Sequence, residues 1–215
     1  MPETVEVTTG ENPAGSVIWL HGLGADGHDF EPIVPELRLD IPLRFVFPHA
    51  PVRPVTINGG MAMRAWYDIL SLDTDGRADQ AGVRESGKML ETLIAREVER
   101  GIEPGKIVIA GFSQGGAIVL HTLLNTEYEL AGAMALSTYL PILGDLEVAS
   151  SRKDIPIFMA HGTSDPMLPM QWGRQSADAI EEAGYQIDWH EYPMAHAVCP
   201  QEIADISAWL KGVFA

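Results

Sequence analysis

The sequence predicts an α/β fold in which a mostly parallel central sheet is covered by helices on both faces. Short apolar runs rich in β-branched and aromatic residues alternate with longer stretches whose apolar residues recur at helical spacing. Strands that are apolar on both sides belong in sheets that are covered on both faces. No internal repeat, low-complexity tract or linker interrupts the 215 residues, so we expect one domain that spans 1–215.

The expected strands are runs of a few apolar residues bounded by turn formers. They lie at 5–7, 16–20, 44–47, 107–109, 131–136, 155–160 and 186–192. The run at 5–7 is short enough to be an edge strand. The others alternate with helical stretches, which is the order that builds a parallel sheet.

The expected helices differ in how they should be buried. Residues 79–100 carry one apolar face and are followed by Gly101, a stop signal, so they predict a helix that covers the sheet. The stretch after Gly115 is apolar nearly all round and predicts a helix buried on several sides. Further helices are expected at 30–39 (interrupted by Pro35), at 172–183 and from Pro200 onward.

The charge and composition of the chain argue against several classes of binding partner. A net charge of −16 argues against nucleic acids and anionic membrane surfaces, because both attract basic patches. Cys199 is the only cysteine, the N-terminus lacks a signal-peptide pattern, and no apolar run is long enough to span a bilayer. We therefore expect a cytoplasmic protein with neither nucleic-acid nor integral-membrane partners. We further expect a small-molecule substrate and a monomer or homodimer. No metal site is expected, since no His-Glu-x-x-His or Cys-x-x-Cys spacing occurs.

The turn Gly111-Phe112-Ser113-Gln114-Gly115 lies between an apolar strand and an apolar helix. A bland Gly/Ser-rich turn is the simplest interpretation of such a stretch. In this setting, however, Gly-x-Ser-x-Gly is the pattern of a nucleophile elbow, in which a strained turn exposes the serine at a helix N-terminus. Ser113 is therefore the candidate nucleophile, and Cys199 is a weaker alternative.

A serine nucleophile needs a base and an acid, which follow it in the order acid then histidine on this kind of sheet. Among the later aspartates, only Asp165 lies in a loop just beyond a buried strand. Among the later histidines, only His196 follows that acid in a loop after a strand. The predicted triad is Ser113, Asp165 and His196. His121 lies on the helix after the elbow, where a packed core histidine is the expected role.

The glycine-rich loop His21–Gly27 follows the strand at 16–20 and allows two interpretations. It lacks the Gly-x-Gly-x-x-Gly and P-loop patterns of a phosphate-binding loop. An oxyanion loop fits better, because a His-Gly pair after an early strand supplies backbone N–H groups to such sites. The backbone N–H groups of Leu23 and Gln114 are the expected oxyanion donors.

The long segment 51–65 contains several turn formers, two methionines and no strong periodicity, and it leads to Trp66-Tyr67-Asp68. It predicts a loop, which would be either a packed surface loop or the rim of an acyl pocket. The sequence leaves both open.

Several longer motifs resemble the phospholipase/carboxylesterase family of small α/β-hydrolases, which includes bacterial carboxylesterases and acyl-protein thioesterases. They are Trp19-Leu20-His21-Gly22-Leu23-Gly24, Pro48-His49-Ala50-Pro51, Thr56-Ile57-Asn58-Gly59-Gly60, Trp66-Tyr67-Asp68, Gly111-Phe112-Ser113-Gln114-Gly115-Gly116, Leu136-Ser137-Thr138-Tyr139-Leu140-Pro141, His161-Gly162 with Asp165, and Tyr192-Pro193-Met194-Ala195-His196. Together they span nearly the whole chain.

The resemblance implies an α/β-hydrolase fold without a separate cap domain and a serine carboxylesterase that needs no cofactor. Its substrates would be short- to medium-chain carboxylic esters, with acyl thioesters and lysophospholipids as further candidates. The resemblance also supports Leu23 and Gln114 as oxyanion donors, and it implies a substrate groove near Met63, Trp66, Tyr139 and Leu168. One departure is Ala195, where the family usually has glycine, so the histidine loop is expected to differ slightly.

Two other classes of protein fit the sequence less well. A non-catalytic binding protein with the same fold predicts a broken triad, whereas here all three residues are present. A nucleotide-binding domain would need the missing phosphate motif.

Overall fold

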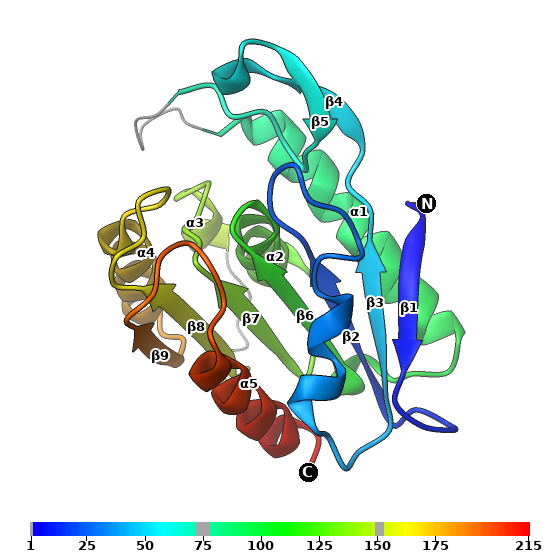
Figure 1. Cartoon of the computed structure of the whole chain (residues 1–215). Coiled ribbons are helices and arrows are strands. Elements are labelled where there is room, and N and C mark those ends of the chain that lie inside the picture. Colours follow the sequence, from blue (N-terminus) through cyan, green and yellow to red (C-terminus); the bar gives the residue numbers. More distant parts are fainter. Residues whose placement is uncertain (1, 72–77, 149–152) are drawn as a thin grey trace.

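The computed structural model describes residues 2–71, 78–148 and 153–215 (Figure 1). Seven strands form the central sheet in the spatial order β1-β3-β2-β6-β7-β8-β9. Their bounds are β1 (Thr4–Thr8), β2 (Gly15–Leu20), β3 (Leu43–Pro48), β6 (Ile107–Phe112), β7 (Gly132–Leu136), β8 (Ile157–Gly162) and β9 (Ile187–Tyr192). The edge strand β1 runs antiparallel to β3, and the other pairings in this sheet are parallel. The predicted fold class is confirmed.

Helices cover both faces of this sheet (Figure 1). They are α1 (Gln80–Glu99), α2 (Gln114–Asn125), α3 (Asp145–Val148), α4 (Met170–Glu182) and α5 (Pro200–Val213). Residues of α1, α2 and α4 belong to one apolar layer, while α5 and the short turns η1 (Glu31–Ile33) and η2 (Pro35–Leu37) close the layer on the opposite face. Across the described ranges, no helix combines the length and apolar character that crossing a bilayer requires.

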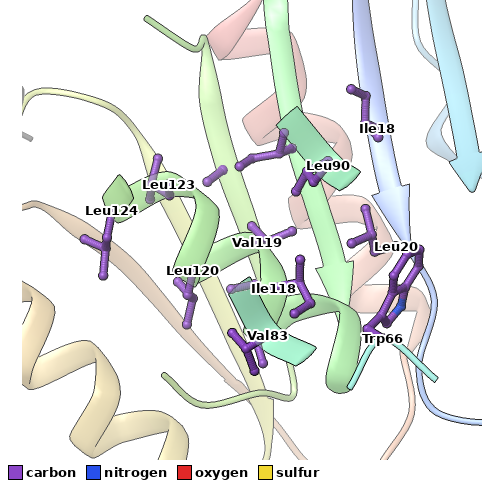
Figure 2. Close-up of a cluster of buried hydrophobic side chains, with 14 of the residues drawn as sticks. Ile18, Leu20, Trp66, Val83, Leu90, Ile118, Val119, Leu120, Leu123 and Leu124 are labelled. Atoms are coloured by element: carbon purple, nitrogen blue, oxygen red, sulfur yellow. The ribbon is translucent and has the colours of Figure 1, made fainter. Parts of the chain in front are cut away.

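The strands have two apolar faces because alternate side chains enter different layers. On β2, Ile18 and Leu20 pack with α1 and α2, whereas Val17 and Trp19 pack on the α5 side. Figure 2 shows the first layer, in which Leu90 of α1 and Val119 of α2 gather near Ile18 of β2. Burial of this kind on both faces holds the strand ends, and the loops that follow them, in fixed positions.

Two local predictions are wrong. Residues 30–39 form the turns η1 and η2 instead of one short helix, because Pro35 lacks the N–H that a helix needs at that interior position. Residues 51–65 are not an irregular loop, since β4 (Val52–Val55) and β5 (Met61–Arg64) pair as an antiparallel hairpin. Between these strands lies the 3-10 turn η3 (Thr56–Asn58).

Candidate active site

Ser113 lies at the sharp turn between β6 and α2, with φ +54° and ψ −118°. The turn is tight enough to require glycine on both sides. A Cβ on Gly111 would lie 2.4 Å from the Gly115 carbonyl carbon, and one on Gly115 would lie 2.5 Å from the Leu20 oxygen. The strained backbone is held because Ser113 N–H donates to the Leu136 oxygen at 2.8 Å.

The three residues of the predicted triad lie in one hydrogen-bonded chain. His196 Nδ1–H donates to Asp165 Oδ2 at 2.6 Å, which leaves Nε2 as an acceptor. The Ser113 hydroxyl, whose Oγ is 2.9 Å from Nε2, donates to that nitrogen. The imidazole is therefore held in the tautomer that can accept the serine proton.

The Asp165 carboxylate is fixed from its other side as well. Its Oδ1 accepts the backbone N–H groups of Met167 at 2.8 Å and Leu168 at 2.9 Å. The carboxylate side chain is fully buried, whereas 17% of the His196 side chain is exposed. A buried, fixed carboxylate of this kind stabilises positive charge on the imidazole more strongly than a solvated one would.

The histidine loop accommodates alanine without strain. Among the described residues, Ala195 is not one of those with positive φ, so it does not need the conformational freedom of glycine. The loop also passes close to the end of β8, because a Cβ on Gly162 would lie 2.4 Å from the Ala195 oxygen. Glycine is therefore required at 162 and not at 195.

The two predicted oxyanion residues lie beside the serine. Leu23 and Gln114 line the same cavity as Ser113, and a Cβ on Gly22 would lie 3.5 Å from Ser113 Cβ. Gln114 is the first residue of α2, where a backbone N–H has no partner within the helix. In the described part of the chain, the Leu23 N–H donates to no backbone oxygen outside regular elements. Both N–H groups are thus available to a ligand.

His21 holds the loop that carries Leu23. Its Nδ1–H donates to the Gly22 oxygen at 2.7 Å, and its Nε2 accepts the Ala50 N–H at 3.1 Å. Burial lowers the pKa of His21 to about 4, so the ring is neutral at physiological pH. Because both ring nitrogens are engaged within the loop region, we assign His21 a structural role.

A cavity of about 250 Å³ opens beside Ser113 and His196, and we call it the Ser113 cavity. Its walls are Gly22, Leu23, Ala25, Asp29, Tyr67, Ile69, Phe112, Ser113, Gln114, Tyr139, Met167, Leu168 and His196. Tyr139 and Leu168 of the predicted groove are among them. Met63 and Trp66 are not, so the structure does not place these two side chains at the cavity surface.

Trp66 lies behind the cavity wall. It is 1% exposed, and its indole N–H donates to the His21 oxygen at 2.9 Å. Its neighbour Tyr67 lines the cavity instead, and the chain bends at these two residues. The prediction from the motifs named Trp66 of this pair and not Tyr67. It also missed Phe112, although that residue lies inside the elbow motif itself.

The Gln114 side chain connects the elbow to this wall. It is buried, its Oε1 accepts the Trp66 N–H at 2.8 Å, and its Nε2 donates to the Tyr67 oxygen at 2.7 Å. A main-chain oxyanion donor did not require this side chain. No sequence pattern predicts these two contacts, because they join residues far apart in the chain.

The remaining candidate residues, His121 and Cys199, do not line the Ser113 cavity. His121 is buried in the core, where its Nδ1 lies 2.6 Å from Asp145 Oδ2. Cys199 lies at the start of α5 and does not line the Ser113 cavity. Within 2–71, 78–148 and 153–215, no group of three or more acidic, histidine or cysteine side chains could hold a metal ion.

Comparison of the sequence with protein families and known proteins agrees with this geometry. The family model described as Phospholipase/Carboxylesterase matches residues 2–214. Acyl-protein thioesterase 1 of Cryptococcus neoformans is 39% identical over 226 residues, covering 96% of this chain and 95% of that protein. Acyl-protein thioesterase 1 of Neurospora crassa is 40% identical over 209 residues, covering 91% and 85%.

Solved structures show the same fold. SOBER1 of Arabidopsis thaliana superimposes with a TM-score of 0.88 at 31% identity, over 94% of this chain and 99% of that one. Acyl-protein thioesterase 2 of Zea mays gives 0.86 at 25% identity, over 100% of both chains. The chain therefore belongs to the phospholipase/carboxylesterase family of α/β-hydrolases, and it is a serine hydrolase that acts on ester or thioester bonds.

Proposed function

We propose that the protein is a serine carboxylesterase in which Ser113, His196 and Asp165 act as nucleophile, base and orienting acid. The observation that carries the proposal is the hydrogen-bonded chain from the Ser113 hydroxyl through His196 to the buried Asp165 carboxylate. A serine hydroxyl attacks a carbonyl only when a base removes its proton, and His196 Nε2 is in position to do so.

The reaction has two steps. In the first, Ser113 Oγ bonds to the carbonyl carbon, the proton passes to His196 Nε2, and the ester or thioester bond breaks as His196 protonates the leaving oxygen or sulfur. In the second, water gives a proton to His196 Nε2 and bonds to the acyl carbon, the bond from that carbon to Ser113 Oγ breaks, and His196 returns the proton to Oγ. The backbone N–H groups of Leu23 and Gln114 stabilise the oxyanion in both steps, a contribution of about 3 kcal/mol for each donor.

The acyl group of the substrate occupies the Ser113 cavity. Its apolar side chains, among them Ile69, Tyr139 and Leu168, suit a hydrocarbon chain. A volume of about 250 Å³ lies below the range that drug-sized ligands need. These features favour short- to medium-chain acyl groups.

Thioesters and lysophospholipids remain candidate substrates within the same mechanism. Two relatives at 39% and 40% identity are named acyl-protein thioesterases, which supports a test of acyl thioesters. We expect kcat/KM for nitrophenyl esters to rise with acyl length and then fall once the chain outgrows the cavity. A parallel series of acyl-thioester peptides and lysophospholipids ranks the bond types.

A fluorophosphonate probe followed by peptide mapping tests the nucleophile. We expect a single label on Ser113, no label in Ser113→Ala, and unchanged labelling in Cys199→Ser. Labelling of another residue in the native protein would overturn the assignment. Because Cys199 is the only cysteine and so cannot form an intramolecular disulfide, we also propose a reducing, cytoplasmic compartment.

A further inference from the structure

A second hollow lies against the catalytic histidine, next to the Ser113 cavity. Its volume is about 460 Å³, and we call it the His196 groove. It is lined by Asp29, Phe30, Pro32, Ile33, Glu36, Phe112, His196, Ala197, Val198 and Ile203. These residues come from the turns η1 and η2 with the segment before them, the end of β6, the histidine loop and α5.

The two spaces share a wall. Asp29, Phe112 and His196 line both of them, and the rings of Phe112 and His196 lie with their centroids 4.8 Å apart. Ser113 and the two oxyanion residues line only the Ser113 cavity. The His196 groove therefore adjoins the Ser113 cavity at the catalytic histidine.

The chemistry of the first step assigns the two spaces to different parts of the substrate. When the bond to the carbonyl carbon breaks, the proton from Ser113 passes through His196 Nε2 to the leaving oxygen or sulfur. The leaving atom must therefore lie next to the imidazole, while the acyl chain remains with Ser113 and the oxyanion donors. The alcohol or thiol part extends away from the imidazole into the space that His196 lines.

The walls of the groove indicate what that part should be. Phe30, Ile33, Val198 and Ile203 provide apolar contact surface. Asp29 and Glu36 are the charged side chains apart from His196, and no lysine or arginine lines the groove among the described residues. Partial burial raises the pKa of Asp29, and the charge of Asp26 raises it further. A cation in the groove would oppose this upward shift, because it favours the ionised form of the carboxylate.

We propose that the His196 groove binds the leaving alcohol or thiol of the substrate and prefers one that carries a positive charge on an apolar body. This inference rests on the proposed function, since it takes His196 as the acid that protonates the leaving atom. Choline-like alcohols and lysine-bearing peptide thiols share this chemistry.

A matched pair of thioesters tests the preference. Butyrylthiocholine and S-(3,3-dimethylbutyl) thiobutyrate share the acyl group and the shape of the leaving group, but only the first is cationic. We expect kcat/KM for the cationic substrate to exceed that for the neutral one by roughly fivefold at low salt, and the ratio to fall as salt screens the carboxylates. A ratio near one at low salt would overturn the proposal.

Substitutions in the groove test which side chains cause the preference for a cationic leaving group. In Asp29→Asn combined with Glu36→Gln, we expect the ratio to fall to about one if these carboxylates cause it. Glu31→Gln is the matched control, because Glu31 lies on η1, pairs with His28 at 2.8 Å and does not line the groove. A ratio that survives the double variant, or that Glu31→Gln abolishes, would also overturn the proposal.

A second series of substrates tests whether the leaving group comes from a peptide or from a small alcohol or thiol. Acylated cysteine peptides with lysine or norleucine beside the cysteine are compared in the native protein and the double variant. A lysine preference that the double variant removes supports a peptide source, and one confined to thiocholine supports a small alcohol or thiol. If the fluorophosphonate probe does not label Ser113, the proposed function is wrong. If the probe labels Ser113 but kcat/KM is the same for the cationic and neutral substrates, only the assignment of the groove is wrong.

Discussion

The Gln114 side chain supports a site in which this residue is predicted to act through its backbone N–H. Its amide joins the first turn of α2 to the Trp66–Tyr67 wall of the Ser113 cavity through two buried hydrogen bonds. In Gln114→Ala, the Trp66 N–H and Tyr67 carbonyl lose their partners. We expect a loss of about 2 kcal/mol in the free energy of unfolding and roughly a tenfold fall in kcat/KM for nitrophenyl butyrate.

Urea unfolding and steady-state kinetics measure these two effects. Gln201→Ala, an exposed position on α5, is the control for loss of an amide. If Gln114→Ala had the same urea midpoint of unfolding and the same kcat/KM as the native protein, the two hydrogen bonds would contribute to neither stability nor catalysis. Gln114 would then act through its backbone alone.

At the residue scale, the sequence was sufficient to predict the site residues that are defined by a motif or by their order along the chain. Ser113, Asp165 and His196 were selected because each follows a strand, and the structure brings their side chains into contact. Their catalytic roles stay predictions. Tyr67 and the Gln114 amide could not be predicted, because they depend on which way a side chain points and on contacts between distant segments.

Helices and buried strands were predicted well, since their periodicity reflects burial. The prediction of a helix over 79–100 agrees closely with α1, where Asp79 caps the N-terminus and Gly101 adopts φ +92°. The β4–β5 hairpin was missed because only part of its apolar surface is buried: Val55 is in the core, but other apolar side chains are exposed, so burial imposes no regular alternation. Val52 is 63% exposed and Met61 is 64% exposed.

Helix α5 contains a buried acid that makes stability depend on pH. Glu202 is fully buried and neither carboxylate oxygen forms a hydrogen bond of normal geometry, although the nearby Cys199 N–H partly offsets the cost. Burial raises the pKa of Glu202 from the usual 4.5 to about 8. Between these values the folded chain keeps a proton that the unfolded chain releases, so this contribution to stability falls as pH rises.

The variant Glu202→Gln removes that dependence. We expect it to be more stable than the native protein by about 2 kcal/mol at pH 8, and to differ little from it at pH 5. Urea unfolding at the two pH values measures the difference. The exposed Glu182→Gln on α4 controls for the change in net charge. An equal effect of Glu202→Gln at both pH values would contradict the assignment of a buried proton.

At the scale of the whole molecule, the candidate active site depends on one property of parallel sheets. The carboxyl ends of the parallel strands meet at a single edge, so β2, β6 and β8 bring the loop with Leu23, Ser113 and Asp165 to one place. This convergence was predictable from the order of strands and loops. The shapes of the Ser113 cavity and the His196 groove were not, because packing between η1, α5 and the loops decides them.

The same sheet should make the chain unfold as one unit, as the prediction of a single domain requires. Each central strand contributes to both apolar layers, as Val17 and Ile18 do on β2, so opening one layer removes a wall of the other. We expect tryptophan fluorescence and far-ultraviolet circular dichroism to give coincident urea transitions.

Variants in the two layers make this test sharper. Leu90→Ala lies in the layer of α1 and α2, and Leu210→Ala lies in the layer of α5. Each creates a cavity among fully buried side chains, so we expect each to lower the free energy of unfolding by about 3 kcal/mol. If the layers are coupled through the strands, both spectroscopic signals shift together in both variants. Separate transitions in either variant would mean that one layer can unfold while the other stays folded, which the shared strands should prevent.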